Sequence, residues 1–279
     1  MECRECGDTG WRARREEGVR SVERCGCWRR RMAQTLLAEA GIPPRYQKCS
    51  FSTFITYPNE KLRRAVQKAQ AFAESFPVVE KGLLLIGRPG IGKTHLAVAA
   101  LREVVLGKGA RALYFDTRTL LSTIRSTFNP VTHTSEADVL DRVMGAELLV
   151  LDDLGAERTT DWVADTMNLI VNTRYNDRRP TIFTSNYEDV SDDSDLDSLR
   201  VRVGFRMHSR LKEMCEFLQY DGPDFREFDF KPGADDLVKS WTAQKPRGKL
   251  PRRTTVRARA QLRDGRLELP WEGGKAGGG

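Results

Sequence analysis

One stretch of eight residues has the composition of a phosphate-binding loop. It matches the pattern G-x-x-x-x-G-K-[ST] in full. Glycines let backbone N–H groups turn toward phosphate oxygens, the lysine places a cation on the β- and γ-phosphates, and the last hydroxyl ligates Mg²⁺. The pattern therefore predicts a site for ATP and Mg²⁺, in which Lys93 also serves catalysis. The expected nucleotide contacts are Gly87, Arg88, Pro89, Gly90, Ile91, Gly92, Lys93 and Thr94.

Two acidic residues end an apolar segment further along the chain. Leu148–Leu151 is followed directly by Asp152 and Asp153, which is the Walker B arrangement of a P-loop sheet. We expect Asp152 to hold Mg²⁺ together with Thr94 and to contribute to nucleotide binding. Asp153 is expected to polarise the attacking water as a catalytic residue.

Four further polar residues extend this predicted site. Asn186 follows an apolar segment, and its side chain is expected to orient the lytic water as a catalytic group. Arg206 and Arg210 lie four residues apart and therefore on one helix face. Arg210 is the expected arginine finger toward a neighbouring subunit's γ-phosphate, with Arg206 in support. Arg226 could contact the nucleotide within its own subunit, although a plain turn explains it equally well.

Four of the six cysteines form two close pairs near the N-terminus, C-x-x-C and C-x-C. No apolar N-terminal segment of a secretion signal precedes them, so the pattern favours a metal over disulfides. Four thiolates suit a tetrahedral Zn²⁺ with no open position, which indicates a structural role. The alternative is four reduced thiols in an unfolded arm. The expected zinc ligands are Cys3, Cys6, Cys25 and Cys27.

An alternation of apolar strands and amphipathic helices must position these residues. Because the strands are mostly apolar and helices separate them, we predict an α/β fold with a five-stranded parallel sheet flanked by helices. The predicted strands are Gly82–Ile86, Ala112–Phe115, Leu148–Leu151, Thr181–Thr184 and Glu216–Tyr220. The predicted helices are Arg29–Ala40, Lys61–Phe76, one from Lys93, Leu120–Thr127, Trp162–Tyr175 and Val203–Cys215.

The formal net charge of +7 is concentrated at the C-terminal end. Residues 232–279 hold eleven Lys/Arg against five Asp/Glu, and such a basic tail contacts nucleic acid or stays solvated.

No apolar run is long enough for a membrane span, so we expect a cytoplasmic protein with no membrane partner. We predict a zinc-binding segment over 1–31, a helical linker over 32–60, an ATPase domain over 61–231 and a mostly disordered basic tail over 232–279.

These motifs resemble the AAA+ family, and more narrowly the bacterial and phage helicase loaders of the DnaC/DnaI type and their IstB transposition-helper relatives. The stretches that carry the resemblance are Ala40–Tyr46, the P-loop, Leu151–Glu157, Thr184–Asn186, Ser209–Leu211 and Gly222–Arg226. The resemblance implies a sensor 1 role for Asn186 and the finger role for Arg210. It also implies that the segment between Leu120 and Val143 faces single-stranded DNA or a partner.

Three functions remain compatible with the sequence. The first is an ATP-dependent loader of a replicative DNA helicase, in which ATP hydrolysis to ADP and phosphate is coupled to self-association through AAA+ interfaces on single-stranded DNA. The second is an IstB-like transposition helper that acts on duplex DNA. The third is a nucleotide-gated adaptor with negligible turnover. By resemblance, zinc-bearing N-terminal segments dock loaders on the helicase, and IstB-like helpers generally lack such a segment, which favours the first.

Overall fold

The computed structural model describes residues 3–16, 19–128, 135–158, 160–190, 195–230, 232–243, 261–263 and 266–268. The chain divides into two units, residues 1–243 and residues 244–279. In the second unit the described residues are β8 (Gln261–Arg263) and β9 (Arg266–Glu268), which pair antiparallel. Among the helices in the described part of the chain, none is long and apolar enough to span a membrane.

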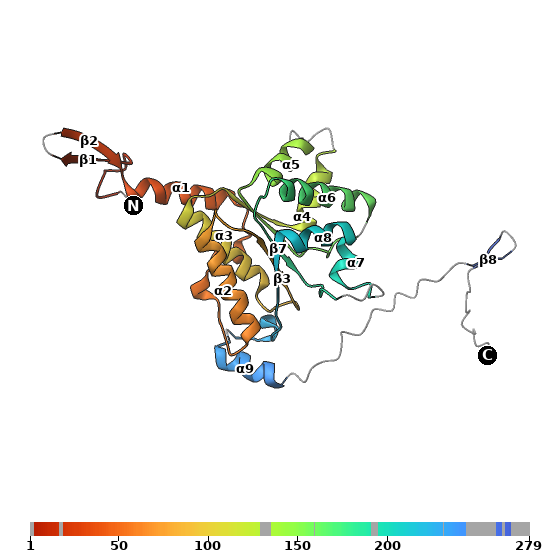
Figure 1. Ribbon diagram of the computed structural model, residues 1–279. Coiled ribbons are helices and arrows are strands. Elements are labelled where there is room, and N and C mark those ends of the chain that lie inside the picture. The colour runs from red at the N-terminus through yellow and green to blue at the C-terminus, as the bar shows by residue number, and fades with distance from the viewer. Residues whose placement is uncertain are drawn as a thin grey trace, which may run out of the picture. The chain divides into compact units, whose positions relative to one another are not determined.

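A five-stranded parallel sheet lies at the centre of the first unit (Figure 1). The strand order is β4-β5-β6-β3-β7, so the strand that leads into the P-loop lies between two others. Because all five strands run in the same direction, their carboxyl ends meet at one edge of the sheet, where ligands bind in open α/β folds. The strands are β3 (Gly82–Ile86), β4 (Ala112–Asp116), β5 (Leu148–Asp152), β6 (Thr181–Ser185) and β7 (Cys215–Gln219). The predicted fold class is confirmed.

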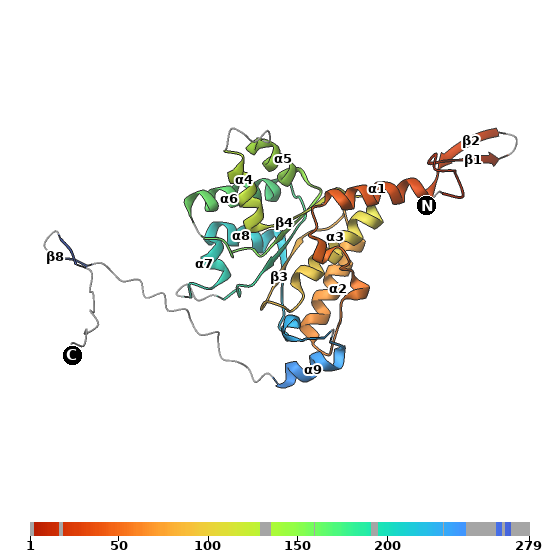
Figure 2. The same ribbon diagram turned by 180° about the vertical axis from the view of Figure 1, so that it is seen from behind.

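Helices cover both faces of this sheet, as the opposite view also shows (Figure 2). Helices α2 (Glu60–Ser75) and α3 (Lys93–Lys108) pack on one face. The other face carries α4 (Thr117–Ser126), α5 (Glu136–Gly145), α6 (Asp161–Asn176), α7 (Leu199–Val203) and α8 (Phe205–Met214).

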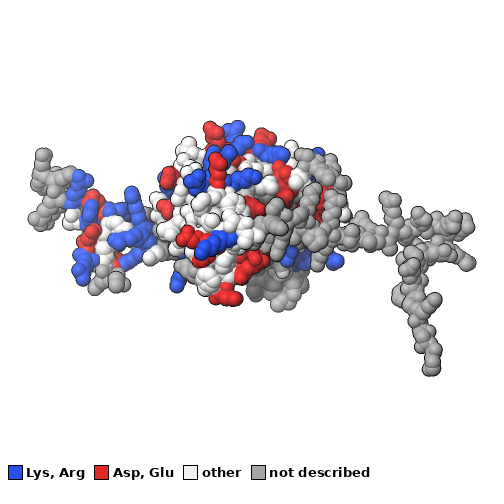
Figure 3. All heavy atoms as spheres, turned by 90° about the horizontal axis from the view of Figure 1, so that it is seen from below, with Lys and Arg blue, Asp and Glu red and all other residues white. Residues whose placement is uncertain are grey.

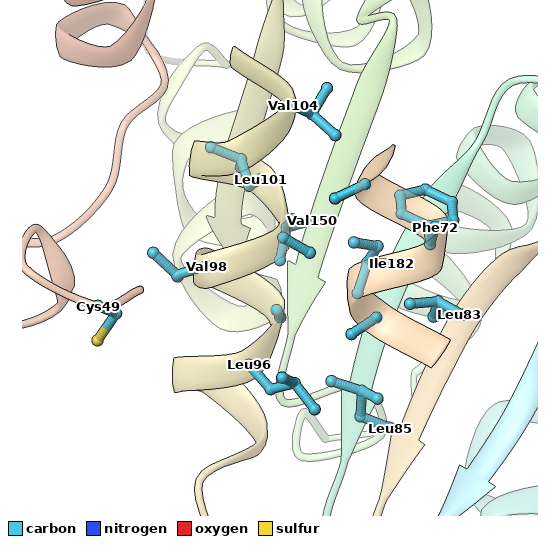
Figure 4. Close-up of a cluster of buried hydrophobic side chains, with 14 of the residues drawn as sticks. Cys49, Phe72, Leu83, Leu85, Leu96, Val98, Leu101, Val104, Val150 and Ile182 are labelled. Carbon is cyan, nitrogen blue, oxygen red and sulfur yellow. The ribbon is translucent and has the colours of Figure 1, made fainter. Parts of the chain in front are cut away.

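Each strand of the sheet contributes to two hydrophobic cores, because successive side chains point to opposite faces. In β3, Leu83 and Leu85 belong to the core beneath α2 and α3 (Figure 4), whereas Leu84 and Ile86 belong to the other core. Burial on both faces explains why the strands are continuous apolar runs in the sequence rather than alternating patterns.

The predicted helix over Val203–Cys215 differs from the structure at both ends. Helix α7 ends at Val203, and Gly204 separates it from α8 with a φ of +83°. Cys215 is the first residue of β7 and not the end of a helix. Helix α5 was not predicted; it begins with a capping box in which the Ser135 side chain accepts from the N–H of Asp138.

The N-terminal segment folds as a hairpin followed by a helix. Strands β1 (Trp11–Glu16) and β2 (Val19–Arg24) pair antiparallel, and α1 (Gly26–Glu39) begins directly after them. A helix from Arg29 was predicted from the sequence, but the hairpin was not. This hairpin lies between the two cysteine pairs, and therefore determines how they approach each other.

Residues 40–59, predicted as part of a linker, lie against the ATPase body. They include the short helices η1 (Pro44–Tyr46) and η2 (Phe51–Thr53). The His95 ring nitrogen Nε2 lies 3.0 Å from Ser50 O, and Asn59 Nδ2 donates to Asp221 O at 2.7 Å. This segment therefore follows α3 from the edge of the sheet to the loop after β7.

Part of the segment 232–279, which was predicted as a mostly disordered tail, is helical. Residues Ala234–Ala243 form helix α9, in which Leu237 is buried. The ring of Trp241 lies 5.9 Å from that of Tyr57, so the helix packs against residues 40–59. Its side chains cover apolar surface. The helix was not predicted, because the surrounding residues of the tail are highly charged. Apart from β8 and β9, the tail after Ala243 lies outside the described residues.

Arg174 is a buried cation in α6, with 1% of its surface exposed. Burial lowers its pKa to about 9. Three of its acceptors are carbonyls at the carboxyl end of α5, where the helix dipole favours a cation. The acceptors are Thr181 Oγ1 and the carbonyl oxygens of Val143, Met144, Ala146 and Pro180, at 2.7–3.1 Å.

We expect Arg174→Met to lower the free energy of unfolding by about 3 kcal/mol, because it leaves several buried carbonyls without donors. Urea denaturation followed by circular dichroism measures the change. Arg158→Met is the matched control, since Arg158 is exposed, and its effect should stay within about 0.5 kcal/mol. Equal stabilities for the two variants would contradict this role for Arg174.

Candidate nucleotide and metal sites

The P-loop joins β3 to α3 and is closely packed by side chains from other segments. Gly90 has a φ of +79°, and a Cβ there would lie 1.6 Å from Asp224 Oδ1. Gly92 has a φ of +94°, and a Cβ there would lie 2.8 Å from the Phe54 ring. Both positions require glycine, because other residues rarely adopt this backbone conformation and would collide with these side chains.

Lys93 lies folded over the loop that precedes it. Its Nζ donates to Gly87 O, Arg88 O and Asn186 Oδ1, each at 2.7 Å. The side chain is buried, and burial lowers its pKa to about 8. The ammonium group is therefore held at the loop before any phosphate arrives.

Asp152 ends β5, and hydroxyl groups surround its carboxylate. Thr94 Oγ1 donates to its Oδ1 at 2.9 Å and its Oδ2 at 3.0 Å. Thr184 Oγ1 donates to Oδ1 at 2.6 Å, and Tyr114 OH donates to Oδ2 at 2.7 Å. A carboxylate beside a threonine hydroxyl is the oxygen-rich donor set that Mg²⁺ prefers, so the two predicted magnesium ligands fit that ion.

Asp153 and Asn186 face each other beside Lys93. Asn186 Nδ2 donates to Asp153 Oδ1, while its Oδ1 accepts from Lys93, so the amide bridges the two charged groups. Asp153 has a φ of +61°, a strained conformation for a non-glycine residue, and its N–H donates to Thr184 Oγ1 at 3.0 Å. Burial and the charge of Asp152 raise the pKa of Asp153. These residues meet because all of them follow parallel strands.

Arg226 lies in the short helix η3 (Phe225–Glu227), which belongs to a loop that is bonded to the P-loop. Phe225 N–H donates to Gly90 O at 3.1 Å, and Arg226 N–H donates to Asp224 Oδ1 at 2.8 Å. The bond from Phe225 places Arg226 beside the P-loop of its own subunit, and its contact with a nucleotide stays a prediction.

Arg210 lies on α8 and bonds within its own helix. Its Nη1 donates to Arg206 O at 3.1 Å, and Arg206 is exposed. In the described part of the chain, Arg210 makes no hydrogen bond to the P-loop. A finger role would thus require the site of a second subunit.

Three groups that were not predicted from the sequence support the site. Arg118 donates to Ala156 O, and Arg202 donates to Gly155 O at 2.9 and 2.7 Å, so the two guanidinium groups hold the loop after β5. Tyr114 supports Asp152. Tyr114 could have been predicted as a supporting residue, because its hydroxyl lies within an otherwise apolar predicted strand. The sequence around Arg118 and Arg202 contains no pattern that indicates their role.

The four N-terminal cysteines form a compact cluster. Their Sγ atoms all lie within 4.8 Å of one another, and none of the four forms a disulfide. The Cys3 and Cys25 sulfurs are 3.7 Å apart, and those of Cys6 and Cys27 are 3.3 Å apart. A tetrahedral zinc–thiolate site has sulfur–sulfur edges of about 3.8 Å, so the cluster fits Zn²⁺.

The model of IstB-like ATP binding proteins matches residues 25–227. The chain is 28% identical over 203 residues to the uncharacterized protein YqaM of Bacillus subtilis (strain 168), covering 69% of this chain and 61% of that protein. It is 28% identical over 179 residues to the replicative helicase loader DnaC of Escherichia coli (strain K12), covering 64% of this chain and 69% of that one. A crystal structure of the DnaC helicase loader superposes with a TM-score of 0.56 at 34% identity, over 63% of this chain and 99% of that chain.

The family match covers well over half of the chain and includes the P-loop, the two aspartates at the end of β5 and the loop of Arg226. The Cys3–Cys6 pair lies before the matched residues, and α9 lies after them. The chain belongs to the family of IstB-like ATP binding proteins.

Proposed function

We propose that this protein is an ATP-dependent loader of a replicative DNA helicase. The observation that carries the proposal is the combination of two sites in one chain, a complete P-loop site and a four-cysteine cluster joined to it by α1. Relatives named as replicative helicase loaders, in sequence and in solved structures, support the same function. The chain spans 61% of the length of its YqaM relative. The loader function is therefore proposed for this chain and is not transferred from the whole of that relative.

In this proposal the residues around the P-loop bind ATP and promote its hydrolysis to ADP and phosphate. Lys93 contacts the β- and γ-phosphates, and Thr94 and Asp152 hold Mg²⁺, which supplies positive charge at the phosphates. Asp153 accepts a hydrogen bond from the attacking water while Asn186 orients it. Arg226 senses the γ-phosphate within the subunit, and Arg210 completes the site of a neighbouring subunit, which makes self-association depend on ATP.

Asp153→Asn tests whether hydrolysis is part of the function. We expect turnover to fall about 100-fold or more, because an amide is a poor acceptor for the proton of water. ATP affinity should not fall, since the change removes a negative charge near the phosphates. Phosphate release and fluorescent-nucleotide titration measure the two quantities. Asp161→Asn, at an exposed position in the first turn of α6, is the control.

The outcome also separates the loader from an adaptor that only binds nucleotide. Full helicase loading by Asp153→Asn, together with negligible turnover by the unaltered protein, would favour the adaptor.

ATP affinity is expected to depend on pH through Lys93. Its pKa is about 8 in the free protein, and bound phosphates raise that pKa because they stabilise the ammonium form. The bound state then holds more protons, so affinity falls as pH rises above 8, by at most about tenfold per pH unit. Calorimetry at pH 9 in two buffers of different ionisation enthalpy should detect proton uptake. An affinity that stays constant between pH 7 and pH 10 would contradict this expectation.

The helicase itself provides the direct test. The full chain is mixed with the replicative helicase of the same organism in ATP, in ADP and without nucleotide, and complexes are separated by size-exclusion chromatography. We expect a complex that Cys27→Ser weakens, since the cysteine cluster is the proposed docking segment. The absence of any complex under all three conditions would refute the loader.

The family match favours a transposition helper as the second candidate. Such a protein acts on duplex DNA, whereas the proposed loader assembles on single strands. Residues 40–226 hold 25 Lys/Arg and 25 Asp/Glu, and the two signs are interspersed on the face in Figure 3. Net charge therefore does not favour duplex over single strands, and titration of both DNA forms in ATP is decisive. A strong preference for duplex would support the helper.

A further inference from the structure

The residue after α1 is bonded to the edge strand of the sheet. Ala40 is fully buried, and its carbonyl oxygen accepts a hydrogen bond from Tyr114 N–H at 2.7 Å. Gly41 follows with a φ of +74°, and a Cβ there would lie 3.1 Å from Tyr114 O. Because β4 is an edge strand, no strand lies beside it on the side of the Tyr114 N–H, and Ala40 O accepts the hydrogen bond from that group instead. The end of α1 is thus held against one residue of β4.

The same residue reaches the magnesium site with its side chain. Tyr114 is 4% exposed, and its hydroxyl donates to Asp152 Oδ2 at 2.7 Å. Asp152 lies on β5, which pairs with β4 in parallel. The other donors to this carboxylate are Thr94 from α3 and Thr184 from β6. Three different elements therefore determine the orientation of one carboxylate. Among the described residues, Tyr114 is the one of these donors that is also hydrogen-bonded to the Ala40–Gly41 turn.

We propose that Tyr114 is a positioning residue that couples the Ala40–Gly41 turn to the magnesium ligand Asp152. Its hydroxyl holds Oδ2 so that the carboxylate stays beside Thr94, and the turn holds the backbone of Tyr114. This inference rests on the proposed function, since it deepens the assignment of Thr94 and Asp152 to magnesium.

The proposal gives the cysteine cluster a physical connection to the ATP site. Cys25 precedes α1 and Cys27 lies in its first turn, while the opposite end of the helix leads into the Ala40–Gly41 turn. A partner bound to the N-terminal segment would therefore act on magnesium affinity through one helix and two hydrogen bonds. Groups that orient a metal ligand typically change metal affinity by about 10- to 100-fold when they are removed.

Tyr114→Phe removes only the hydroxyl. Binding of a fluorescent ATP analogue is titrated with MgCl₂, and again in excess EDTA. We expect the Mg²⁺ concentration at half-effect to rise about tenfold, while affinity in EDTA stays unchanged. The matched control is Tyr220→Phe, because the buried Tyr220 hydroxyl has no hydrogen-bond partner among the described residues and its loss should leave the midpoint in place.

The two titrations separate failure of the inference from failure of the proposed function. An unaltered protein that binds no nucleotide in either condition would refute the ATP site itself. An unaltered protein that binds normally, with the same Mg²⁺ midpoint for Tyr114→Phe, would overturn only the role of Tyr114.

Gly41→Ala tests the connection to the turn. A methyl group at this position forces the turn away from Tyr114 O, so we expect the Mg²⁺ midpoint to rise. Gly109→Ala is the control, because Gly109 has a similar φ of +69° with open space around a Cβ. The double variant with Tyr114→Phe should show less than the sum of the two effects, since both act through Tyr114. Additive effects would overturn the coupling.

Should Gly41→Ala fail to fold, hydrogen exchange in the unaltered chain gives a second test. Magnesium added to the nucleotide-bound protein should slow exchange of the Tyr114 amide, which is bonded to Ala40 O. An exchange rate that magnesium leaves unchanged would overturn the coupling.

Discussion

Replacing Lys93 by alanine is expected to reduce ATP affinity by at least about 3 kcal/mol, which is about 100-fold. The ammonium group is buried, and it is held at the phosphate loop by bonds to Gly87 O, Arg88 O and Asn186 Oδ1. In that position its attraction to phosphate oxygens is only weakly screened by water. Titration with a fluorescent ATP analogue at pH 7, where Lys93 is charged, measures the loss.

Stability should not follow affinity in this variant. Burial lowers the pKa of Lys93, so its charge does not stabilise the free protein. The thermal midpoint without nucleotide should therefore fall only by the cost of the hydrogen bonds lost at Gly87 O, Arg88 O and Asn186 Oδ1. The control is Lys108→Ala at the other end of α3, where Nζ donates to Glu74 O outside the loop. Unchanged ATP affinity for Lys93→Ala would refute the nucleotide site.

Replacing Cys27 by serine is expected to abolish stoichiometric zinc binding. The unaltered chain should hold one Zn²⁺, and four-cysteine sites bind it with about 10–16 kcal/mol of apparent free energy. Because the N-terminal segment is too small to form much hydrophobic core of its own, folding of the β1–β2 hairpin should depend on the metal. Elemental analysis gives the zinc content, and limited proteolysis between residues 3 and 25 reports the folding of the hairpin.

Cys49→Ser is the matched control for the zinc prediction. Cys49 is buried on the side of α3 away from the sheet (Figure 4) and lies outside the cysteine cluster, so its replacement should leave the zinc content unchanged. ATP binding should survive in Cys27→Ser, because the ATPase body has its own core. A zinc content that is equal in both variants would contradict the assignment.

The parts of the site that the sequence predicted are contiguous or periodic. The P-loop pattern contains its chemistry within eight residues, and Asp152 and Asp153 directly follow an apolar strand. The sheet was predicted because burial on both faces leaves continuous apolar runs. These features depend on local order along the chain, which is what a sequence records directly.

Other parts of the site depend on residues that are distant in sequence. Tyr114 reaches Asp152 only because β4 and β5 are neighbours, and Arg118 and Arg202 meet at one loop from two different helices. Helix α9 was predicted as tail because its apolar stripe is short and lies among charged residues. Its packing on Tyr57 required the fold to be known.

The sequence by itself determined the fold class, the phosphate-binding loop, the acidic pair and the four cysteines that can bind a metal. Only the tertiary structure decided which donors surround Asp152, that the Arg226 loop lies on the P-loop, and that residues 40–59 pack along α3. The physical reason is that motifs arise from chemistry within a few consecutive residues. The groups that orient a metal ligand such as Asp152 come instead from separate elements. They are brought within hydrogen-bonding distance only when those elements pack together.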